Sequence, residues 1–459
     1  MHKRTFSHTS KSKQKGTVCN MKRINIRMSP PRVLTLSFIM LSIIGTCLLK
    51  LPIATTTSIS WLDALFTTVS ACTVTGLGVV DTGKVFTLFG QCVILTLIQV
   101  GGLGIMSFAV LIAIMLGRKI GLQNRILLQQ ALNQTNIGGV IRLAKALFLF
   151  SFTVECIASF ILSFEWVPKY GIAKGIYYSF FHSISAFNNA GFSVWSDNLM
   201  SHSHSILVNL VISSLIILGG IGFTVIVDIK RKKNFKNLTL HSKLMLSSTL
   251  IVNIIATIFI FTFEFHNSLS MRGFTPFEEG MAAYFQAIST RTAGFNTVDI
   301  SALSKPSLLL MMLLMFIGAG SASTGGGIKL TTFLIMFFGV FKFLQEQDDI
   351  VVFKKSIKDT LIVKSLTITI ISISFIFFAI LILSITERVP LLMSAFEVFS
   401  AFGTVGLSMN FTPHLTMIGK AIIIFMMFFG KMGPLTLAFS FARKKNRKIK
   451  YPNEDILTG

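Results

Sequence analysis

One four-part pattern occurs four times along the chain, and this internal repeat constrains the fold more than any other feature. Each copy has a Phe and a Ser separated by three residues, a central Gly five or six residues after the Ser, and a second Gly-rich site 24 to 28 residues later. The Phe/Ser pairs are Phe66/Ser70, Phe181/Ser185, Phe285/Ser289 and Phe396/Ser400; the central glycines are Gly76, Gly191, Gly294 and Gly406; the second sites are Gly101-Gly102, Gly219-Gly220, Gly318 and Gly430. The central glycines are 103 to 115 residues apart, far more than the roughly 20 to 50 residues of solenoid repeats.

The composition places these copies in a membrane. Of the 459 residues, 52% are hydrophobic and only 13% are charged, against roughly one-quarter charged residues in a soluble domain. Eight apolar stretches are long enough to cross a bilayer, which takes about 20 helical residues. They cover residues 33–51, 85–116, 144–164, 205–229, 243–265, 306–343, 361–386 and 416–442. The eight stretches form four successive pairs. Between the two members of each pair lies a shorter apolar run that contains the Phe and the Ser.

Each copy is therefore predicted to contain a membrane helix, a short pore helix, a Gly-centred loop and a second membrane helix. Non-helical backbone at membrane depth is tolerated only where it is buried in protein or lines a water-filled cavity. The predicted fold is an all-α integral membrane protein with four pseudo-symmetric repeats, and thus eight transmembrane helices, around one central pore. The predicted boundaries are 1–32 for a basic tail, 33–117, 140–232, 243–343 and 357–442 for the repeats, and 443–459 for a second basic tail.

The net charge of +24 marks topology rather than a nucleic-acid partner. A nucleic-acid-binding protein concentrates base on one polar surface, whereas here Lys and Arg cluster between the apolar runs. Cytoplasmic connections retain Lys and Arg, so the basic tails predict that both termini are cytoplasmic. These basic segments can also attract anionic membrane lipid, at about 1 kcal/mol per residue.

The four loops, residues 74–78, 189–193, 292–296 and 404–408, are called loops 1 to 4. Gly adopts backbone dihedrals closed to other residues, so successive carbonyls can face one axis and replace the hydration shell of an ion. Loop 4, with Thr404-Val405-Gly406, nearly repeats the Thr-Val-Gly-Tyr-Gly signature of potassium channels. No loop has an acid at its narrow position, which favours a monovalent cation. The predicted ion-binding residues are Val74, Thr75, Gly76, Asn189, Ala190, Gly191, Thr292, Ala293, Gly294, Thr404, Val405 and Gly406.

Two further features favour cations at the loops. The C-terminus of each pore helix carries about half a negative charge, and four of them would point at one place. Asp81, Asp197 and Asp299 lie just beyond loops 1 to 3, with Asn410 in the fourth copy, and acids near a pore mouth raise the local cation concentration. Taken singly, each acid is more simply a solvated loop carboxylate.

The chain resembles the Trk/Ktr/HKT superfamily of potassium transporters, and most closely the bacterial Ktr membrane subunit. The resemblance covers nearly all of the chain from residue 33, and rests on residues 73–81, 188–193, 290–299, 318–332 and 403–410. In that family a Ser in the first filter is associated with sodium preference, so Gly76 implies potassium as the substrate, with sodium as a candidate activator and no covalent cofactor. The resemblance also implies a homodimer in the plasma membrane, and a cytosolic ring of nucleotide-binding (RCK-type) regulatory subunits docked on basic loops such as residues 230–236.

A Gly-rich segment, residues 318–327, interrupts the predicted second helix of the third copy. It lacks the strand of a dinucleotide fingerprint and the Gly-Lys-Ser/Thr of a Walker loop. In the family, the similar segment is an intramembrane loop that obstructs the pore and moves on activation; a flexible kink is the alternative. The predicted gating residues are Gly318, Gly320, Ser321, Ser323, Thr324, Gly325, Gly326 and Gly327, together with Lys431.

Lys431 lies within the last predicted membrane helix. A charge there costs about 2.5–3.5 kcal/mol on insertion scales, so it needs a partner or a wet cavity. We expect carbonyls freed in the Gly-rich segment to accept from it, while snorkelling to an interface is the alternative. The family commonly has Arg at this place. Lys keeps the positive charge but lacks the planar guanidinium group that makes bidentate hydrogen bonds.

Two other classes of function remain open from the sequence. An alternating-access, sodium-coupled secondary carrier also has broken helices at the midplane, but it usually shows an inverted twofold repeat. A membrane enzyme is disfavoured, because the chain has neither a His-Glu-x-x-His motif nor a nucleophile elbow. The five cysteines show no spacing typical of a disulfide framework or a zinc site.

Overall fold

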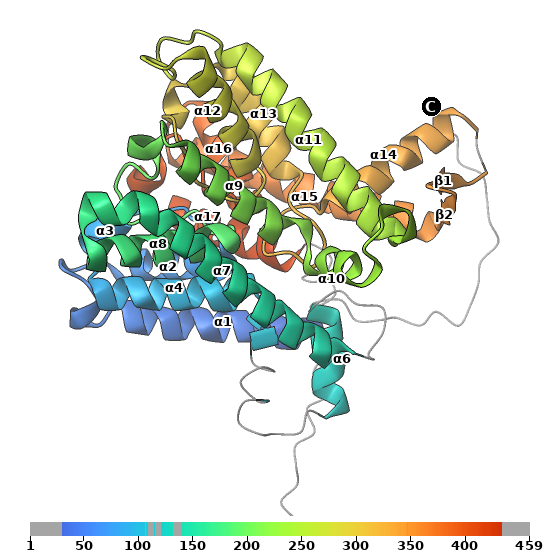
Figure 1. Cartoon of the computed structure of the whole chain (residues 1–459), viewed down its shortest axis with the longest axis horizontal. Coiled ribbons are helices and arrows are strands. Elements are labelled where there is room, and N and C mark those ends of the chain that lie inside the picture. Colours follow the sequence, from blue (N-terminus) through green and yellow to red (C-terminus); the bar gives the residue numbers. More distant parts are fainter. Residues whose placement is uncertain are drawn as a thin grey trace, which may run out of the picture.

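The structure is a computed structural model that describes residues 30–105, 107–108, 114, 121–131, 139–346 and 348–433. These residues are mostly helical, as predicted (Figure 1). Nearly all of the basic tails predicted at 1–32 and 443–459 lies outside the described residues.

The helices follow the order of the four copies. Copy 1 contains α1 (Pro30–Leu49), α2 (Trp61–Thr73), α3 (Thr82–Val85) and α4 (Leu88–Gly102), and α6 (Leu122–Ala131) follows it. Copy 2 contains α7 (Val140–Tyr170), α8 (Ile172–Phe187), α9 (Ile206–Ile221) and α10 (Phe223–Lys232). Copy 3 contains α11 (Leu240–Glu264), α12 (Pro276–Ser289), α13 (Lys305–Phe316) and α14 (Leu330–Leu344). Copy 4 contains α15 (Asp359–Thr386), α16 (Leu391–Gly403) and α17 (Met417–Met432).

The four short helices α2, α8, α12 and α16 each end at a Gly-centred loop, and the repeated Phe anchors each of them in the core. These four Phe side chains are fully buried. The second long helix of each copy packs on the short helix of the next copy: α4 on α8, α9 on α12, α13 on α16, and α17 on α2. An ion pair of 2.7 Å between Lys420 Nζ and Asp63 Oδ1 fastens the last of these contacts. The packing therefore links the four copies in a closed cycle.

The prediction of eight continuous spans is only partly met. By length and composition, four helices of the described part can cross a membrane, α1, α7, α11 and α15, and each is the first long helix of its copy. Within the described residues, the second long helices are short or broken. The span predicted at 205–229 turns by 90° between α9 and α10, and the span predicted at 306–343 is open between Phe316 and Leu330.

The turn at Gly222 has a physical cause that lies far away in the sequence. Gly222 has a φ of 101°, and a Cβ added to it would lie 2.5 Å from the carbonyl oxygen of Ser321. The N–H of Phe223 donates to the carbonyl of Ala322 at 2.9 Å. Carbonyls of the Gly-rich segment of copy 3 thus occupy the position where α9 would otherwise continue, so the chain of copy 2 turns there.

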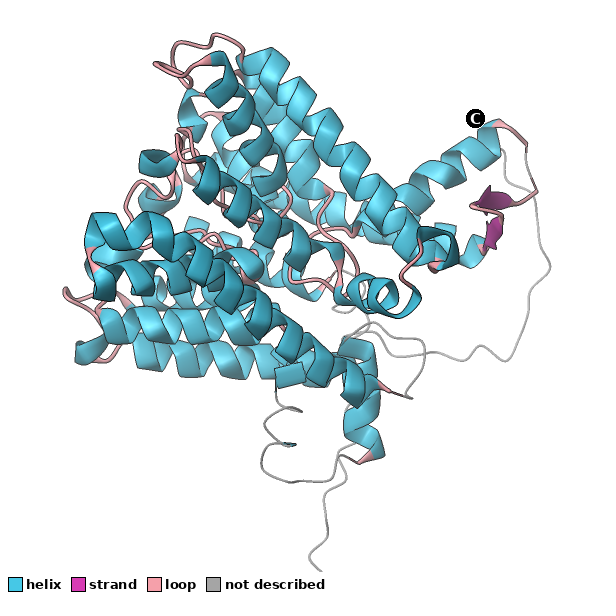
Figure 2. Cartoon of the chain, viewed as in Figure 1, coloured by secondary structure: helices cyan, strands magenta, loops and turns pink. Residues whose placement is uncertain are grey.

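The described part of the fold also contains one short β-hairpin beside its helices. Two short antiparallel strands, β1 (Ile350–Val352) and β2 (Lys355–Ile357), connect α14 to α15 (Figure 2). The two turn residues, Phe353 and Lys354, have φ values of 50° and 60°. Positive φ at both central residues is the requirement of a type I′ hairpin, which Asn-Gly usually meets. Phe-Lys gives no such signal in the sequence.

Candidate functional site

The four central glycines lie against one another in a closed cycle. A Cβ added to Gly76 would lie 2.3 Å from the carbonyl oxygen of Ala190, one on Gly191 2.8 Å from that of Ala293, one on Gly294 2.2 Å from that of Val405, and one on Gly406 2.1 Å from that of Thr75. Any side chain at a central Gly would therefore collide with the backbone of the next loop. The structure brings the twelve residues predicted to bind an ion together in one place.

The sign of φ alternates along each loop. The central glycines have φ values of 67° to 97°, and the residue two positions earlier also has a positive φ in every copy: Val74, Asn189, Thr292 and Thr404. Positive φ is uncommon for residues other than Gly, and in a β-branched residue such as Val or Thr it costs of order 1–3 kcal/mol. Positive φ at the same position of all four loops, strained in the three that have Val or Thr there, indicates a specified backbone conformation.

The repeated Ser holds each loop to its own short helix. In copies 1 and 4 the N–H of the central Gly donates to the hydroxyl oxygen of Ser70 or Ser400, at 3.1 Å in both. In copies 2 and 3 the hydroxyl of Ser185 or Ser289 donates instead to the carbonyl that follows the central Gly. These tethers offset part of the strain in the loops and explain why Ser recurs in the sequence pattern.

The second Gly-rich sites let the long helices approach the ends of the short helices. A Cβ on Gly101, Gly219 or Gly430 would lie 1.8 to 1.9 Å from the last carbonyls of α2, α8 and α16. Copy 3 differs, because a Cβ on Gly318 would meet the carbonyl of Gly326, inside the Gly-rich segment itself, at 2.1 Å.

The Gly-rich segment lies directly against loops 3 and 4. The N–H of Gly326 donates to Thr404 Oγ1 at 2.9 Å, and a Cβ on Gly325 would lie 2.2 Å from Thr292 Oγ1. Gly320 is tied to α9 by a hydrogen bond of 2.8 Å to the carbonyl of Gly220. The segment is thus packed between the loops and the break in copy 2.

Two lysines hold carbonyls of this segment. Lys431 Nζ donates to the carbonyl of Thr324 at 2.5 Å, and Lys329 Nζ donates to that of Gly325 at 2.7 Å. Both side chains are only partly exposed. A charged donor strengthens a hydrogen bond roughly twofold over a neutral one. Carbonyls of this segment are the partners expected for Lys431 from the sequence, whereas Lys329 is a second donor that the sequence pattern does not predict.

The three acids beyond the loops each have a structural partner. Asp81 caps α3 by accepting from Gly83 N at 3.0 Å, Asp197 accepts from Ser201 N at 2.9 Å, and Asp299 accepts from Ser301 N at 2.9 Å. All three acids remain partly exposed. Local capping therefore explains these acids without an ion, and any attraction of cations would come in addition.

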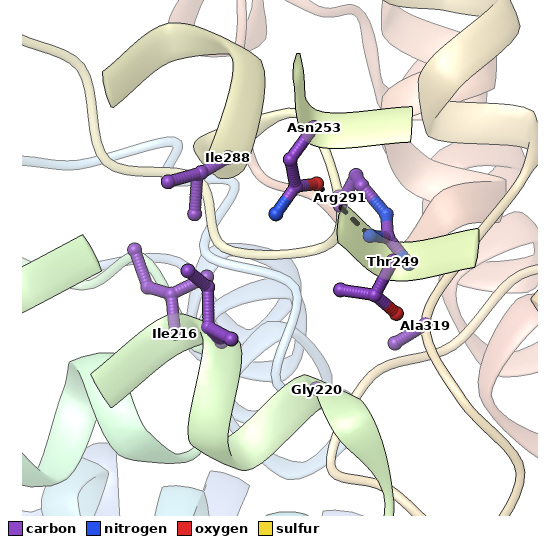
Figure 3. Close-up of a pocket in the computed structure, with 8 residues that line it drawn as sticks. Ile216, Gly220, Thr249, Asn253, Ile288, Arg291 and Ala319 are labelled. Carbon is purple, nitrogen blue, oxygen red and sulfur yellow. Dashed lines mark hydrogen bonds between the residues drawn. The ribbon is translucent and has the colours of Figure 1, made fainter. Parts of the chain in front are cut away.

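A small cavity behind loop 3 is lined by the buried, positively charged side chain of Arg291, which was not predicted from the sequence (Figure 3). Arg291 is 7% exposed, and its Nη1 donates to Asn253 Oδ1 at 3.0 Å. Its Nε has no hydrogen-bond partner among the described residues. The cavity of about 20 Å³ also faces Thr249 and Gly220, and is large enough for one water molecule. The sequence does contain one sign of this site, because an Arg next to a loop predicted at membrane depth needs a buried partner or a wet cavity.

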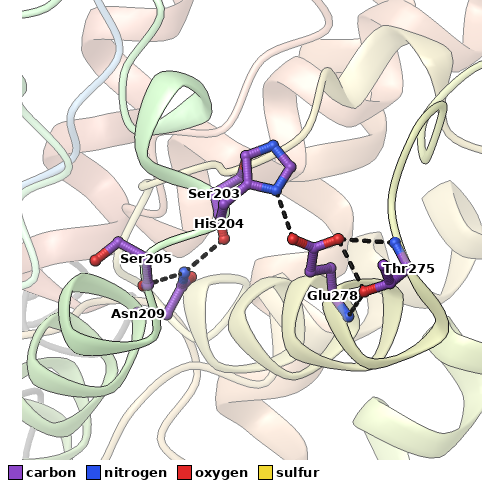
Figure 4. A network of polar contacts seen from close by, with 6 residues as sticks. All are labelled: Ser203, His204, Ser205, Asn209, Thr275 and Glu278. Carbon is purple, nitrogen blue, oxygen red and sulfur yellow. Dashed lines mark hydrogen bonds and ion pairs between the residues drawn. The ribbon is translucent and has the colours of Figure 1, made fainter.

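Glu278 joins copies 2 and 3 at the exposed start of α12 (Figure 4). Its carboxylate accepts from the N–H of Thr275 at 2.7 Å and from His204 Nδ1 at 2.8 Å. The bond from the Thr275 backbone, followed by the contact with His204, lowers the pKa of Glu278 from its ordinary 4.5 to about 2. A group with a lowered pKa stabilises the fold above its unfolded pKa and loses that effect as the pH falls.

We therefore expect Glu278→Gln to lower the melting temperature of the purified protein at neutral pH. Because the carboxylate becomes protonated, the difference from the unchanged protein should shrink as the pH falls from about 4.5 to about 2. Thermal unfolding of both proteins across this range measures the effect. A difference that stays constant down to the lowest pH would show that the ionised carboxylate contributes nothing.

Comparisons with known proteins agree with this geometry. The family model "TrkH: Cation transport protein" matches residues 5–449. The chain is 52% identical to Ktr system potassium uptake protein B of Bacillus subtilis (strain 168), over 95% of this chain and 98% of that protein. It is 38% identical to the potassium/sodium uptake protein NtpJ of Enterococcus hirae, over 95% of this chain and 99% of that protein.

A solved structure has the same fold. The potassium transporter TrkH of Vibrio parahaemolyticus superposes with a TM-score of 0.71 at 19% identity, over 91% of this chain and 86% of that one. The names of these relatives are those of ion transporters, which fits the expectation that the chain is not an enzyme. The resemblance found in the sequence is thereby confirmed, and the chain belongs to the TrkH family of cation transport proteins.

Proposed function

We propose that this chain is the pore-forming subunit of a bacterial potassium uptake system, with loops 1 to 4 as its selectivity filter. The observation that carries the proposal is the closed cycle of four glycines, each facing a carbonyl of the next loop. Four neutral loops with alternating φ would direct backbone oxygens, rather than charged groups, at one point, as a filter for a monovalent cation requires. The relatives named as potassium uptake proteins support the choice of ion.

The proposal includes eight passages through the plasma membrane, with the second helix of each copy short or broken and both termini in the cytoplasm. The Gly-rich segment would obstruct the path on one side of the filter, since it contacts Thr404 and Thr292. Lys431 would stabilise the obstructed state through the Thr324 carbonyl.

We include a partner and a second copy in the proposal. The name of the relative "Ktr system potassium uptake protein B" describes one component of a system. A cytosolic nucleotide-binding ring would regulate this chain by docking on residues 230–236, which are all exposed and include four lysines and an arginine. The membrane chain itself would act as a homodimer.

Ion flux into liposomes tests the proposal. The purified chain should carry potassium and rubidium at similar rates, and sodium and lithium at least about tenfold more slowly, because the carbonyl spacing suits the larger ions. Flux with and without a sodium gradient separates a channel-like path from a sodium-coupled carrier. Equal rates for all four ions, in protein that is folded by thermal unfolding, would refute the selective filter.

A further inference from the structure

The residue that follows the repeated Phe is a buried polar residue in every copy. These four residues are Thr67, His182, Gln286 and Glu397, and none is more than 2% exposed. They lie behind the loops, on the short helices. The residue two positions after the central Gly lies at the far end of each loop, and in two copies it contacts the buried polar residue. These loop-end residues are Gly78, Ser193, Asn296 and Ser408.

In copy 4 this contact is made by a carboxylate. Ser408 Oγ donates to Glu397 Oε2 at 2.9 Å, and Thr412 Oγ1 donates to Oε1. Ser408 Oγ also accepts from the N–H of Phe411 at 3.1 Å. The hydroxyl of Ser408 therefore connects the end of loop 4 to a fully buried acid, for which no ion pair is present within the described residues.

Copy 2 repeats the arrangement with a histidine. His182 Nε2 lies 3.1 Å from Ser193 Oγ, and Ser193 Oγ accepts from the N–H of Trp195 at 3.0 Å. His182 Nδ1 must carry the proton, because it lies 2.8 Å from the carbonyl of Tyr178, which can only accept. Nε2 of the neutral ring and the carbonyl of Asn198, which lies 3.2 Å from Ser193 Oγ, are then the two acceptors for the single proton of the serine hydroxyl.

Copies 1 and 3 have no such contact in the described part of the chain. Gly78 has no side chain, and Thr67 bonds to the Asp63 carbonyl of its own helix at 2.9 Å. The amide of Gln286 has no hydrogen-bond partner there, and Asn296 donates to the carbonyl of Val298 at 2.9 Å. Loops 2 and 4 are not neighbours in the glycine cycle, so loops with and without this second contact alternate around it.

We propose that Glu397 is a positioning residue for cation selectivity, which holds the end of loop 4 through Ser408, and that His182 does the same for loop 2 through Ser193. The inference rests on the proposed function of the loops as a potassium filter. A ring of carbonyls discriminates against a smaller ion only if the loops do not close around that ion. Glu397 accepts from two hydroxyl groups at once, Ser408 Oγ and Thr412 Oγ1, so this buried acid suits the task.

The test uses the full chain in liposomes with Glu397→Gln, Ser408→Ala and the double variant. Glu397→Gln keeps the shape of the side chain but removes the carboxylate, and should lower the preference for potassium over sodium about tenfold through the apparent KM values, with a smaller change in maximal rate. Because both variants break the same contact, the double variant should show no more loss than Ser408→Ala alone.

Glu264→Gln is a matched control. Glu264 is also a buried carboxylate, at 1% exposed, but it accepts from Ser304 N at 2.8 Å and Ser270 Oγ at 2.7 Å at the end of α11. Its removal should lower the melting temperature and leave the ion preference unchanged. If Glu397→Gln does not fold, Ser408→Ala and Thr412→Val remove the same contacts from the other side.

The outcomes separate this inference from the filter proposal, because Gly406→Ala is measured beside these variants. If Gly406→Ala changes the preference while folded Glu397→Gln and Ser408→Ala retain it, Glu397 has only a structural role and the inference is overturned. An additive double variant overturns it too. If Gly406→Ala also leaves the preference unchanged, the loops are not the filter.

Discussion

Replacing Gly76 by Ser is expected to remove most of the preference for potassium over sodium, at least about tenfold, and Gly406→Ser should act in the same direction. The physical reason is twofold: a side chain at either position collides with the neighbouring loop, and both glycines have a positive φ that other residues adopt only with strain. A Cβ at Gly76 would lie 2.3 Å from the carbonyl oxygen of Ala190, and one at Gly406 would lie 2.1 Å from that of Thr75. Neither oxygen is at the end of a flexible side chain, so the neighbouring loop must move and the carbonyl spacing must change.

Gly273→Ser is the matched control for this prediction. Gly273 has a φ of 82°, close to the 90° of Gly76, but no heavy atom of the described part of the chain lies within 4 Å of a Cβ added there. This variant adds the same left-handed strain without the collision, so it should lower stability slightly and keep the ion preference. Unchanged preference in both Gly76→Ser and Gly406→Ser, measured by flux of each ion into liposomes, would contradict the shared filter.

The features that could be predicted from the sequence are those that recur in all four copies. The Phe, the Ser and the central Gly each have one physical task, as core anchor, loop tether and point of close approach, so their spacing survives in the sequence. The interruption at residues 318–327 was also predictable, because so many small residues destabilise a helix by up to about 1 kcal/mol for each Gly.

The features that were missed depend on contacts between distant segments. Residues 205–229 are mostly apolar around Gly219, Gly220 and Gly222, and the position of the turn at Gly222 depends on the approach of the Ser321 carbonyl from copy 3. Glu397 was overlooked because its partners lie 11 and 15 residues away, on the loop beyond the glycine. Arg291 was overlooked because its partner, Asn253, lies 38 residues earlier on α11. Periodicity and composition carry no information about such pairs.

Deleting residues 321–324 is expected to raise the flux of the chain alone, and to lessen the effect of the proposed cytosolic partner on that flux. The deletion removes the Thr324 carbonyl that Lys431 holds and the residues that occupy the break at Gly222. It also shortens the connection that presses Gly326 against Thr404. A hydrogen bond from a charged donor contributes about 1.5–3 kcal/mol, so losing one should raise the open population about tenfold or more.

Lys431→Ala should raise the flux in the same direction but by less than the deletion, because Lys329 still holds the neighbouring carbonyl of Gly325. Lys431→Arg keeps the charge and a donor, and should retain the low flux of the unchanged chain, which makes it the control for loss of the ammonium. Membrane fractionation and thermal unfolding establish that each variant folds and reaches the membrane. If the deletion variant passes both checks and yet conducts no faster without the partner, the Gly-rich segment is a packing kink, and Lys431 stabilises the fold rather than a closed state.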